Sequence, residues 1–435
     1  MRLLLKGGRV IDPSQDLDKV ADLLIEGGRI AEIGDIGPKA ADLKPGQIED
    51  VSGKVVLPGL IDMHVHFREP GFEYKEDITT GSRAAAAGGF TAVATMPNTN
   101  PVTDARSVLE FILRRAQEVN LVKIHPIGAL TKELKGEEMA EIGDMIEGGA
   151  VAFSDDAFPI QNSGLMRRVM DYCAMFDVPV ILHCEDMSLS DEGLMNEGLT
   201  ATILGLNGIP AEAEEIAVAR NIMLARLTGC RMHVAHVSAR GSVDLIRRAK
   251  EAGLRVTCET CPQYFSLTEE AVRGYDTNAR INPPLRTADD VAAIKEGLAD
   301  GTIDVIATDH APHAIEEKET EFAAAASGMV GLETAVGLVV TELVKPGILS
   351  LAEAFEKMSA APARILGSAA ADGTLQVGKA ADVTVVDPAA EFVVDPSKFH
   401  SRSKNTPLAG RRLTGMPALT VFNGKVVARA GEVIA

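Results

Sequence analysis

Eight short apolar runs recur between residues 57 and 370, and helix-like stretches rich in Ala, Leu, Glu and Arg separate most of them. The runs cover residues 57–63, 89–96, 121–128, 149–154, 178–184, 231–237, 254–260 and 303–308. Continuously apolar strands that alternate with helices, such as those expected over 107–118 and 241–252, indicate a parallel sheet buried on both faces. Eight such units favour a closed (β/α)8 barrel, an α/β fold, over an open sheet.

The two ends of the chain have a different pattern, in which short apolar runs alternate with Gly turns. Residues 3–5, 9–11 and 21–25 read as strands, and so do 381–387 and 419–427, the last around an Asn-Gly turn. Neither end is long enough to bury a good core alone. We therefore expect one small β-sandwich domain made from residues 1–56 and 371–435, with the barrel over 57–370.

The charge balance limits the partners of this chain. Its 43 Lys and Arg residues face 62 Asp and Glu residues, a net charge of −19, which repels nucleic acid and anionic membranes. No apolar run approaches the roughly 18 residues of a membrane span, and the apolar start is too short for a signal peptide. Five cysteines without disulfide-framework spacing indicate a reducing cytoplasm. An anionic substrate would need a local positive centre.

Histidines and aspartates gather where the predicted strands end, which is where barrel enzymes carry their active sites. They are His64 and His66 on run one, Asp155 and Asp156 after run four, His183 on run five, His236 on run six and Asp309 after run eight. His64 and His66 share one strand face. Imidazole and carboxylate groups are zinc ligands, and ligands from five strand ends favour two ions about 3.5–4 Å apart, bridged by a carboxylate and a hydroxide. Alternation alone does not choose between Asp155 and Asp156.

Other residues of the same types are expected to be structural. His125 and His400 lie outside the pattern, and His233 lies deeper on its strand than His236. A single Cys258-x-x-Cys261 pair without a second pair predicts buried strand thiols and not a zinc knuckle.

Four motifs carry a resemblance to a known family. The segment Pro-Gly-Leu-Ile-Asp-Met-His-Val-His at 58–66 resembles the opening of the amidohydrolase superfamily. The phrases Phe-Arg-Glu-Pro-Gly at 67–71, Met-Pro-Asn-Thr-Asn-Pro at 96–101 and Ala-Thr-Asp-His-Ala-Pro-His at 307–313 resemble dihydroorotases of the long, bacterial class I type, and the likeness extends over the whole chain. It implies a cyclic-amide hydrolase that reversibly closes N-carbamoyl-L-aspartate to L-dihydroorotate and water in pyrimidine biosynthesis.

The resemblance also implies roles for residues of this chain. His64, His66 and Asp309 would hold one zinc ion, His183 and His236 the other, and Asp156 would bridge them, two ions per subunit. Many superfamily members bridge with a carboxylated lysine, but no Lys occurs between 148 and 159. Asp309 would shuttle the proton between the zinc-bridged hydroxide and the amide nitrogen. The substrate contacts would be Arg68, Asn98, Asn282, His313, Ser327 and Gly328.

Arg68 is the residue on which the choice of substrate depends. It follows His66 by two positions, so we expect it on the same strand face, where its guanidinium suits a substrate carboxylate. Dihydropyrimidinases, hydantoinases and allantoinases act on rings without that carboxylate and would not need Arg68 together with Asn98. A non-catalytic partner of aspartate transcarbamoylase would be expected to lose metal ligands, which this chain keeps. A homodimer is expected, and a complex of the active enzyme with aspartate transcarbamoylase stays open.

Overall fold

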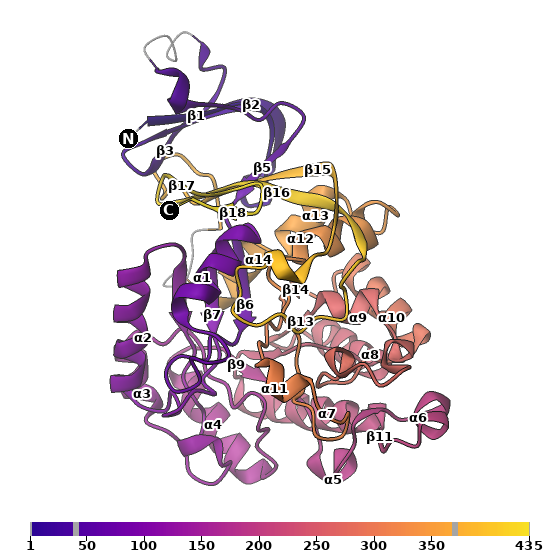
Figure 1. Ribbon diagram of the computed structural model, residues 1–435. Helices are drawn as coiled ribbons and strands as arrows, with labels where there is room; N and C mark the ends of the chain where they lie inside the picture. The colour runs from indigo at the N-terminus through magenta and orange to yellow at the C-terminus, as the bar shows by residue number, and fades with distance from the viewer. Residues whose placement is uncertain (1, 38–42, 368–372, 435) are drawn as a thin grey trace.

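The computed structural model describes residues 2–37, 43–367 and 373–434. It consists of a barrel surrounded by helices and a β-rich part that carries both termini (Figure 1). The boundary expected between residues 370 and 371 lies outside these described ranges. In the described residues, no helix combines the length and apolar character needed to cross a membrane.

The β-rich part is one sheet built from both ends of the chain. Its strands are β1 (Arg2–Asp12), β2 (Leu17–Glu26), β3 (Arg29–Gly34), β4 (Ile48–Asp50), β5 (Val55–Pro58), β15 (Val383–Val393), β16 (Arg412–Phe422), β17 (Lys425–Arg429) and β18 (Glu432–Val433). β5 pairs with β1 on one side and with β15 on the other, which joins the N-terminal and C-terminal strands. Leu5 and Ile25 pack in one cluster with Val385 and Val421. The sheet thus encloses a core of its own, as a sandwich does.

The barrel contains the parallel strands that the apolar runs predict. They are β6 (Leu60–Val65), β7 (Phe90–Thr95), β8 (Lys123–Pro126), β9 (Val180–Leu182), β12 (Met232–Val234), β13 (Val256–Thr260) and β14 (Val305–Ile306). Single bridges close the ring: Phe153 pairs with Gly128 and Val180, and Val65 pairs with His310. The predicted fold class, a (β/α)8 barrel with a small β domain from both termini, is confirmed.

The fourth run, 149–154, differs from its prediction because it forms no regular strand. Phe153 alone forms ladder bridges, although Val151 and Ser154 also donate backbone hydrogen bonds to the neighbouring segment. The chain then turns out of the ladder, because the carboxylate of Asp155 accepts hydrogen bonds from the backbone N–H groups of Leu130 and Thr131 at 2.8 and 3.0 Å. This turn brings the next residue, Asp156, over the end of the barrel.

Helices cover the outside of the barrel. They are α1 (Ile78–Ala87), α2 (Arg106–Val119), α3 (Ile142–Glu147), α4 (Ser163–Met175), α7 (Ala211–Thr228), α8 (Arg240–Glu251), α10 (Ala288–Ala299), α12 (Ala335–Val339), α13 (Leu351–Glu356) and α14 (Ala360–Leu366). The expected helices over 107–118 and 241–252 correspond to α2 and α8. Short elements occupy the loops: α5 (Met187–Ser190), α6 (Leu199–Leu204), α9 (Pro262–Ser266), α11 (Ile315–Lys318), β10 (Met195–Asn196) and β11 (Gly208–Ile209).

Candidate metal centre and substrate pocket

Six buried side chains meet at the carboxyl end of the barrel. They are the six sequence candidates for metal ligation: His64, His66, Asp156, His183, His236 and Asp309. Two groups have ligand atoms within 4.8 Å of one another, one with His64 and His66 and the other with His183 and His236, and Asp156 belongs to both. The parallel strands of the barrel end at the same rim, so residues far apart in sequence converge there.

The Asp156 carboxylate faces both groups at once. One oxygen lies 3.2 Å from His236 Nε2 and 3.7 Å from His183 Nδ1. The other lies 3.6 Å from the Nε2 atoms of both His64 and His66. Burial opposes ionisation, but His64 and His236 outweigh it and hold the pKa of Asp156 well below its usual range. The geometry therefore assigns to Asp156, and not to Asp155, the position between two groups of ligands.

Asp309 stands beside the first group. One of its carboxylate oxygens lies 3.1 Å from His66 Nε2 and 3.5 Å from His64 Nε2. It also lines the adjoining cavity, where a substrate would bind. Asp309 can thus contact a metal ligand group and a bound molecule.

Hydrogen bonds outside the cluster turn free nitrogen lone pairs toward its centre. His64 Nδ1 lies 2.6 Å from a Glu259 oxygen, His66 Nδ1 lies 2.9 Å from Asn98 Oδ1, and His183 Nε2 lies 2.7 Å from a carboxylate oxygen of Glu185. Oxygen acceptors at these atoms suit a ring N–H there, and in the neutral imidazole the opposite nitrogen is then the one available to a metal ion.

Those opposite nitrogens point at one another. His183 Nδ1 lies 2.9 Å from His236 Nε2, and the buried His64 Nε2 has no hydrogen-bond partner in the described residues. Converging lone pairs beside ionised carboxylates repel one another unless a cation lies between them. The site therefore fits divalent metal ions held by imidazole and carboxylate.

Sequence reasoning missed two of the residues that orient the histidines. Glu259, the next-to-last residue of β13, is fully buried and contacts His64 and, at 3.3 Å, His233. Glu185 contacts His183 and accepts a hydrogen bond from Asn282 Nδ2 at 3.0 Å. Both carboxylates lie at the carboxyl ends of barrel strands, and that position was the signal that could have identified them.

A cavity of about 340 Å³ adjoins the cluster, and Arg68 faces it. Arg68 does not lie on the strand face of His64 and His66, so that prediction was wrong: β6 ends at Val65, and Arg68 has a φ of +61°. The turn nevertheless directs the side chain to the pocket, where Arg68 is only 9% exposed and its Nε donates to the carbonyl of Pro312 at 3.2 Å. No carboxylate of the described residues forms an ion pair with it. Burial lowers the pKa of Arg68 to about 10, so the guanidinium stays charged at neutral pH.

The other predicted substrate residues also line this cavity: Asn98, Asn282, His313, Ser327 and Gly328. Asn98 contacts His66 through its amide oxygen, and Asn282 donates through its amide nitrogen to Glu185, the partner of His183. His313 Nε2 lies 2.9 Å from the carbonyl oxygen of Ser327 and 3.4 Å from a terminal nitrogen of Arg68. Gly328 packs so closely that a Cβ there would lie 2.8 Å from the Cβ of Ala311.

The residues expected to be structural lie outside the cluster. His233 hydrogen-bonds Thr257 and Glu259, and the backbone N–H of His400 donates to Glu333. His125 is buried, and burial lowers its pKa to about 3. Cys258 and Cys261 are buried free thiols.

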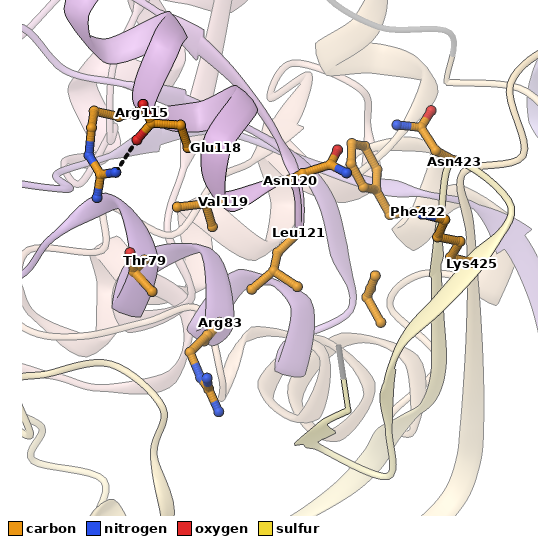
Figure 2. Close-up of a pocket in the computed structure, with 11 residues that line it drawn as sticks. Thr79, Arg83, Arg115, Glu118, Val119, Asn120, Leu121, Phe422, Asn423 and Lys425 are labelled. Atoms are coloured by element: carbon orange, nitrogen blue, oxygen red, sulfur yellow. Dashed lines mark hydrogen bonds and ion pairs between the residues drawn. The ribbon is translucent and has the colours of Figure 1, made fainter.

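A second cavity, of about 610 Å³, lies between α1, α2 and the β16–β17 turn. Figure 2 shows an apolar centre around Leu121, with Arg83 and Lys425 on opposite sides of it and Arg115 turned to Glu118. Its described lining contains no histidine and a single carboxylate, that of Glu118, so the cavity is not a second centre of the kind found at the barrel rim.

Comparisons with known proteins agree with this site. A family model described as dihydro-orotase-like matches residues 53–242. The dihydroorotase of Pelotomaculum thermopropionicum is 56% identical, covering 98% of each chain, and that of Acetivibrio thermocellus is 53% identical, covering 98% of this chain and 99% of its own. Among solved structures, the L-hydantoinase (dihydropyrimidinase) of Arthrobacter aurescens superposes with a TM-score of 0.88 at 30% identity, covering 100% of this chain and 97% of its own.

Proposed function

Because this chain belongs to the dihydroorotase family, we propose that it interconverts N-carbamoyl-L-aspartate and L-dihydroorotate in pyrimidine biosynthesis. It is a hydrolase of cyclic amides, and its site is built for metal binding. We assign two zinc ions to the two ligand groups that share Asp156. His64, His66 and Asp309 would hold one ion, and His183 and His236 the other.

One observation carries the choice of substrate, namely that the buried Arg68 guanidinium has no carboxylate partner among the described residues. An unpaired buried charge is unfavourable unless a counter-ion joins it. Two carboxylates near Arg68 in sequence have other partners: Glu69 accepts from Arg115, and Asp62 accepts from the backbone N–H of Thr308. Arg68 therefore suits the carboxylate of dihydroorotate, which hydantoins lack.

The chemistry divides between the metal ions and this chain. When bound, two zinc ions supply an acidified water and a Lewis acid for the amide carbonyl. Asp309 takes the proton of the attacking water during ring opening and gives it to the departing amide nitrogen. In ring closure, the same carboxyl takes the proton from the amide nitrogen and gives it to the departing water. Asn98, Asn282 and His313 orient the ring from the cavity wall.

The test compares two substrates in one variant. Arg68→Ala should raise KM for dihydroorotate strongly and leave a ring analogue without the carboxylate, such as dihydrouracil, nearly unaffected at its own low rate. Arg68→Lys should restore only part of the affinity, because a point charge cannot form the planar fork. Equal losses for both rings would show that Arg68 is structural and would favour a hydantoinase-like activity.

Partners and compartment complete the proposal. All five cysteines are free and buried, which supports a reducing cytoplasm. We propose a homodimer as the working form. A complex with aspartate transcarbamoylase is the second assembly to examine, by co-elution of the two enzymes at equal concentration.

A further inference from the structure

Lys318, the last residue of the short helix α11 (Figure 1), is a buried lysine behind the wall of the substrate cavity. It is only 4% exposed, and it forms no ion pair with a carboxylate within the described part of the chain. Its Nζ instead donates to three backbone carbonyls, those of Ala326 at 2.7 Å, Gly328 at 3.1 Å and Arg280 at 3.4 Å. An ammonium group has three donors, so all of them are used on the backbone.

The three carbonyls belong to two segments that line the substrate cavity. Ala326 and Gly328 flank Ser327, which lines the cavity. Arg280 lies two residues before Asn282, which lines the same cavity. The backbone N–H of Gly328 also donates to the carbonyl of Arg280 at 2.9 Å. The buried ammonium group therefore lies where the two segments meet, and it binds both.

The turn at residues 326–328 is held through its carbonyls. That of Ser327 lies 2.9 Å from His313 Nε2, and that of Gly328 accepts a second hydrogen bond from Asn405 Nδ2 at 3.0 Å. The backbone N–H of Ser327, by contrast, donates to no group in the described residues, and Ser327 is exposed. The turn thus has its acceptors engaged by the protein and one donor left for a bound molecule.

We infer that Lys318 is a positioning residue, which fixes the Ser327–Gly328 turn against the segment of Asn282 so that both meet the bound ring in one arrangement. This inference rests on the proposed function, because it assigns both segments to the binding of dihydroorotate. Without the ammonium group, the two segments lose the contact that they share, and substrate binding must order them at a cost in affinity. Lys318 contacts no candidate metal ligand, so the loss should appear in KM and not in kcat.

Lys318 is charged at neutral pH, although its surroundings disfavour the charge. Burial, followed by the charge of Arg280, lowers the pKa of Lys318 to about 8, while Asp276 and Glu317 act in the opposite direction. Glu317 is itself paired with Lys75 at 2.6 Å. An amine that has lost its proton keeps two donors and gains a lone pair, which cannot satisfy three carbonyls.

The first test is the steady-state kinetics of the zinc-loaded enzyme with dihydroorotate. Lys318→Met should raise KM at least about tenfold, because it removes three hydrogen bonds from a charged donor, and should leave kcat and zinc content nearly unchanged. Lys318→Arg should restore most of the affinity, since Lys318 also lines a cavity of about 860 Å³ that has room for a longer side chain. Lys357→Met is the matched control. Lys357 donates to the carbonyl of Ile303 at 2.6 Å, before β14 and far from the substrate wall, so its loss should not change KM.

The pH dependence of KM separates positioning from a purely structural role. In the wild type, KM should rise as the pH passes through about 8. In Lys318→Arg it should not rise there, because a guanidinium keeps its proton. All other titrating groups are the same in the two proteins, so the difference between their profiles reports on residue 318. Identical profiles would overturn the inference even if Lys318→Met does not fold.

Hydrogen exchange followed by mass spectrometry tests the contacts without turnover. In substrate-free Lys318→Met, peptides covering 276–284 and 322–330 should exchange faster than in the wild type and in Lys357→Met. Unchanged exchange and an unchanged KM, in a protein that turns over dihydroorotate, would overturn the role of Lys318 alone. Faster exchange in a protein whose wild type does not act on dihydroorotate would overturn the proposed substrate and leave the contacts of Lys318 supported.

Discussion

Replacing Glu259 by glutamine removes one negative charge from beside His64 while nearly preserving the side-chain volume. The Glu259 carboxylate is fully buried and lies 2.6 Å from His64 Nδ1. Although burial opposes ionisation, the imidazoles of His64 and His233 lower the pKa of Glu259 to about 2. The carboxylate is therefore ionised at every pH at which the enzyme would work. It fixes the His64 ring and makes its Nε2 a stronger donor to metal.

The expected loss follows from the kind of hydrogen bond that changes. A bond to a charged group contributes about 1.5–3 kcal/mol, and one between neutral groups about 0.5–1.5 kcal/mol. Glu259→Gln should therefore weaken binding of the ion at His64 by about 1–1.5 kcal/mol, or roughly five- to thirteenfold. The weaker imidazole ligand adds to this loss, and the total should stay within the roughly 10–100-fold range typical of such outer contacts. At saturating zinc, kcat should recover most of its value, because Asp309 and Arg68 are unchanged.

The assay is competition for zinc between the apoprotein and a chromophoric chelator, with circular dichroism to verify the fold. Glu333→Gln serves as the control, because Glu333 is a largely buried glutamate that hydrogen-bonds the backbone N–H groups of His400 and Ser401 and no candidate ligand. A folded Glu259→Gln protein that binds zinc within twofold of the wild type would refute the positioning role of Glu259.

Three further perturbations test the rest of the site and the fold. Asp309→Asn should lower kcat by orders of magnitude in both directions, and near-normal rates in a metal-loaded sample would assign the proton transfer to another residue. Asp156→Ala should reduce zinc content below two per chain by elemental analysis, whereas Asp155→Ala should mainly lower thermal stability, since Asp155 caps backbone N–H groups; the reverse pattern would exchange their roles. Burial raises the pKa of Glu333 from 4.5 to about 7, so the folded state binds the extra proton and stability falls as pH rises from about 4.5 to about 7. Urea unfolding of Glu333→Gln should lack this fall, and an unchanged pH slope would contradict it.

The fold could be predicted largely from the sequence because apolar runs and turns are local signals. Eight runs identified the barrel, and the Asn423–Gly424 turn identified the hairpin between β16 and β17. The run at 149–154 was misread as a strand for a physical reason. Its apolar residues are buried like those of a strand, but the carboxylate of Asp155 binds the backbone of the preceding loop. That contact joins residues 24 and 25 positions apart, and no local pattern records it.

The site, too, contains residues that the sequence could identify and residues that it could not. The candidate ligands could be named because barrel topology brings strand ends together whatever the intervening sequence. The choice between Asp155 and Asp156 needed coordinates, since both lie after the same run. Glu259 and Glu185 were missed because an acidic residue at a strand end reads equally well as a ligand, a surface charge or a support for a histidine. Only the distances to His64 and His183 separate these possibilities.

The role that we propose for Arg68 explains how a strongly acidic chain would bind an anionic substrate. The negative long-range field of the whole chain opposes the approach of such a substrate, but salt screens that field beyond a Debye length of about 8–10 Å. Inside the cavity, the attraction for an anion comes from Arg68, which is 9% exposed and has no carboxylate partner among the described residues. Several surface arginines of this protein pair with Asp or Glu side chains, as Arg9 pairs with Asp18. The turn after β6 avoids this outcome, because it directs the guanidinium inward and the carbonyl of Pro312 holds it without cancelling its charge. The positive φ of Arg68 is thus the backbone feature on which the substrate selection that we propose depends.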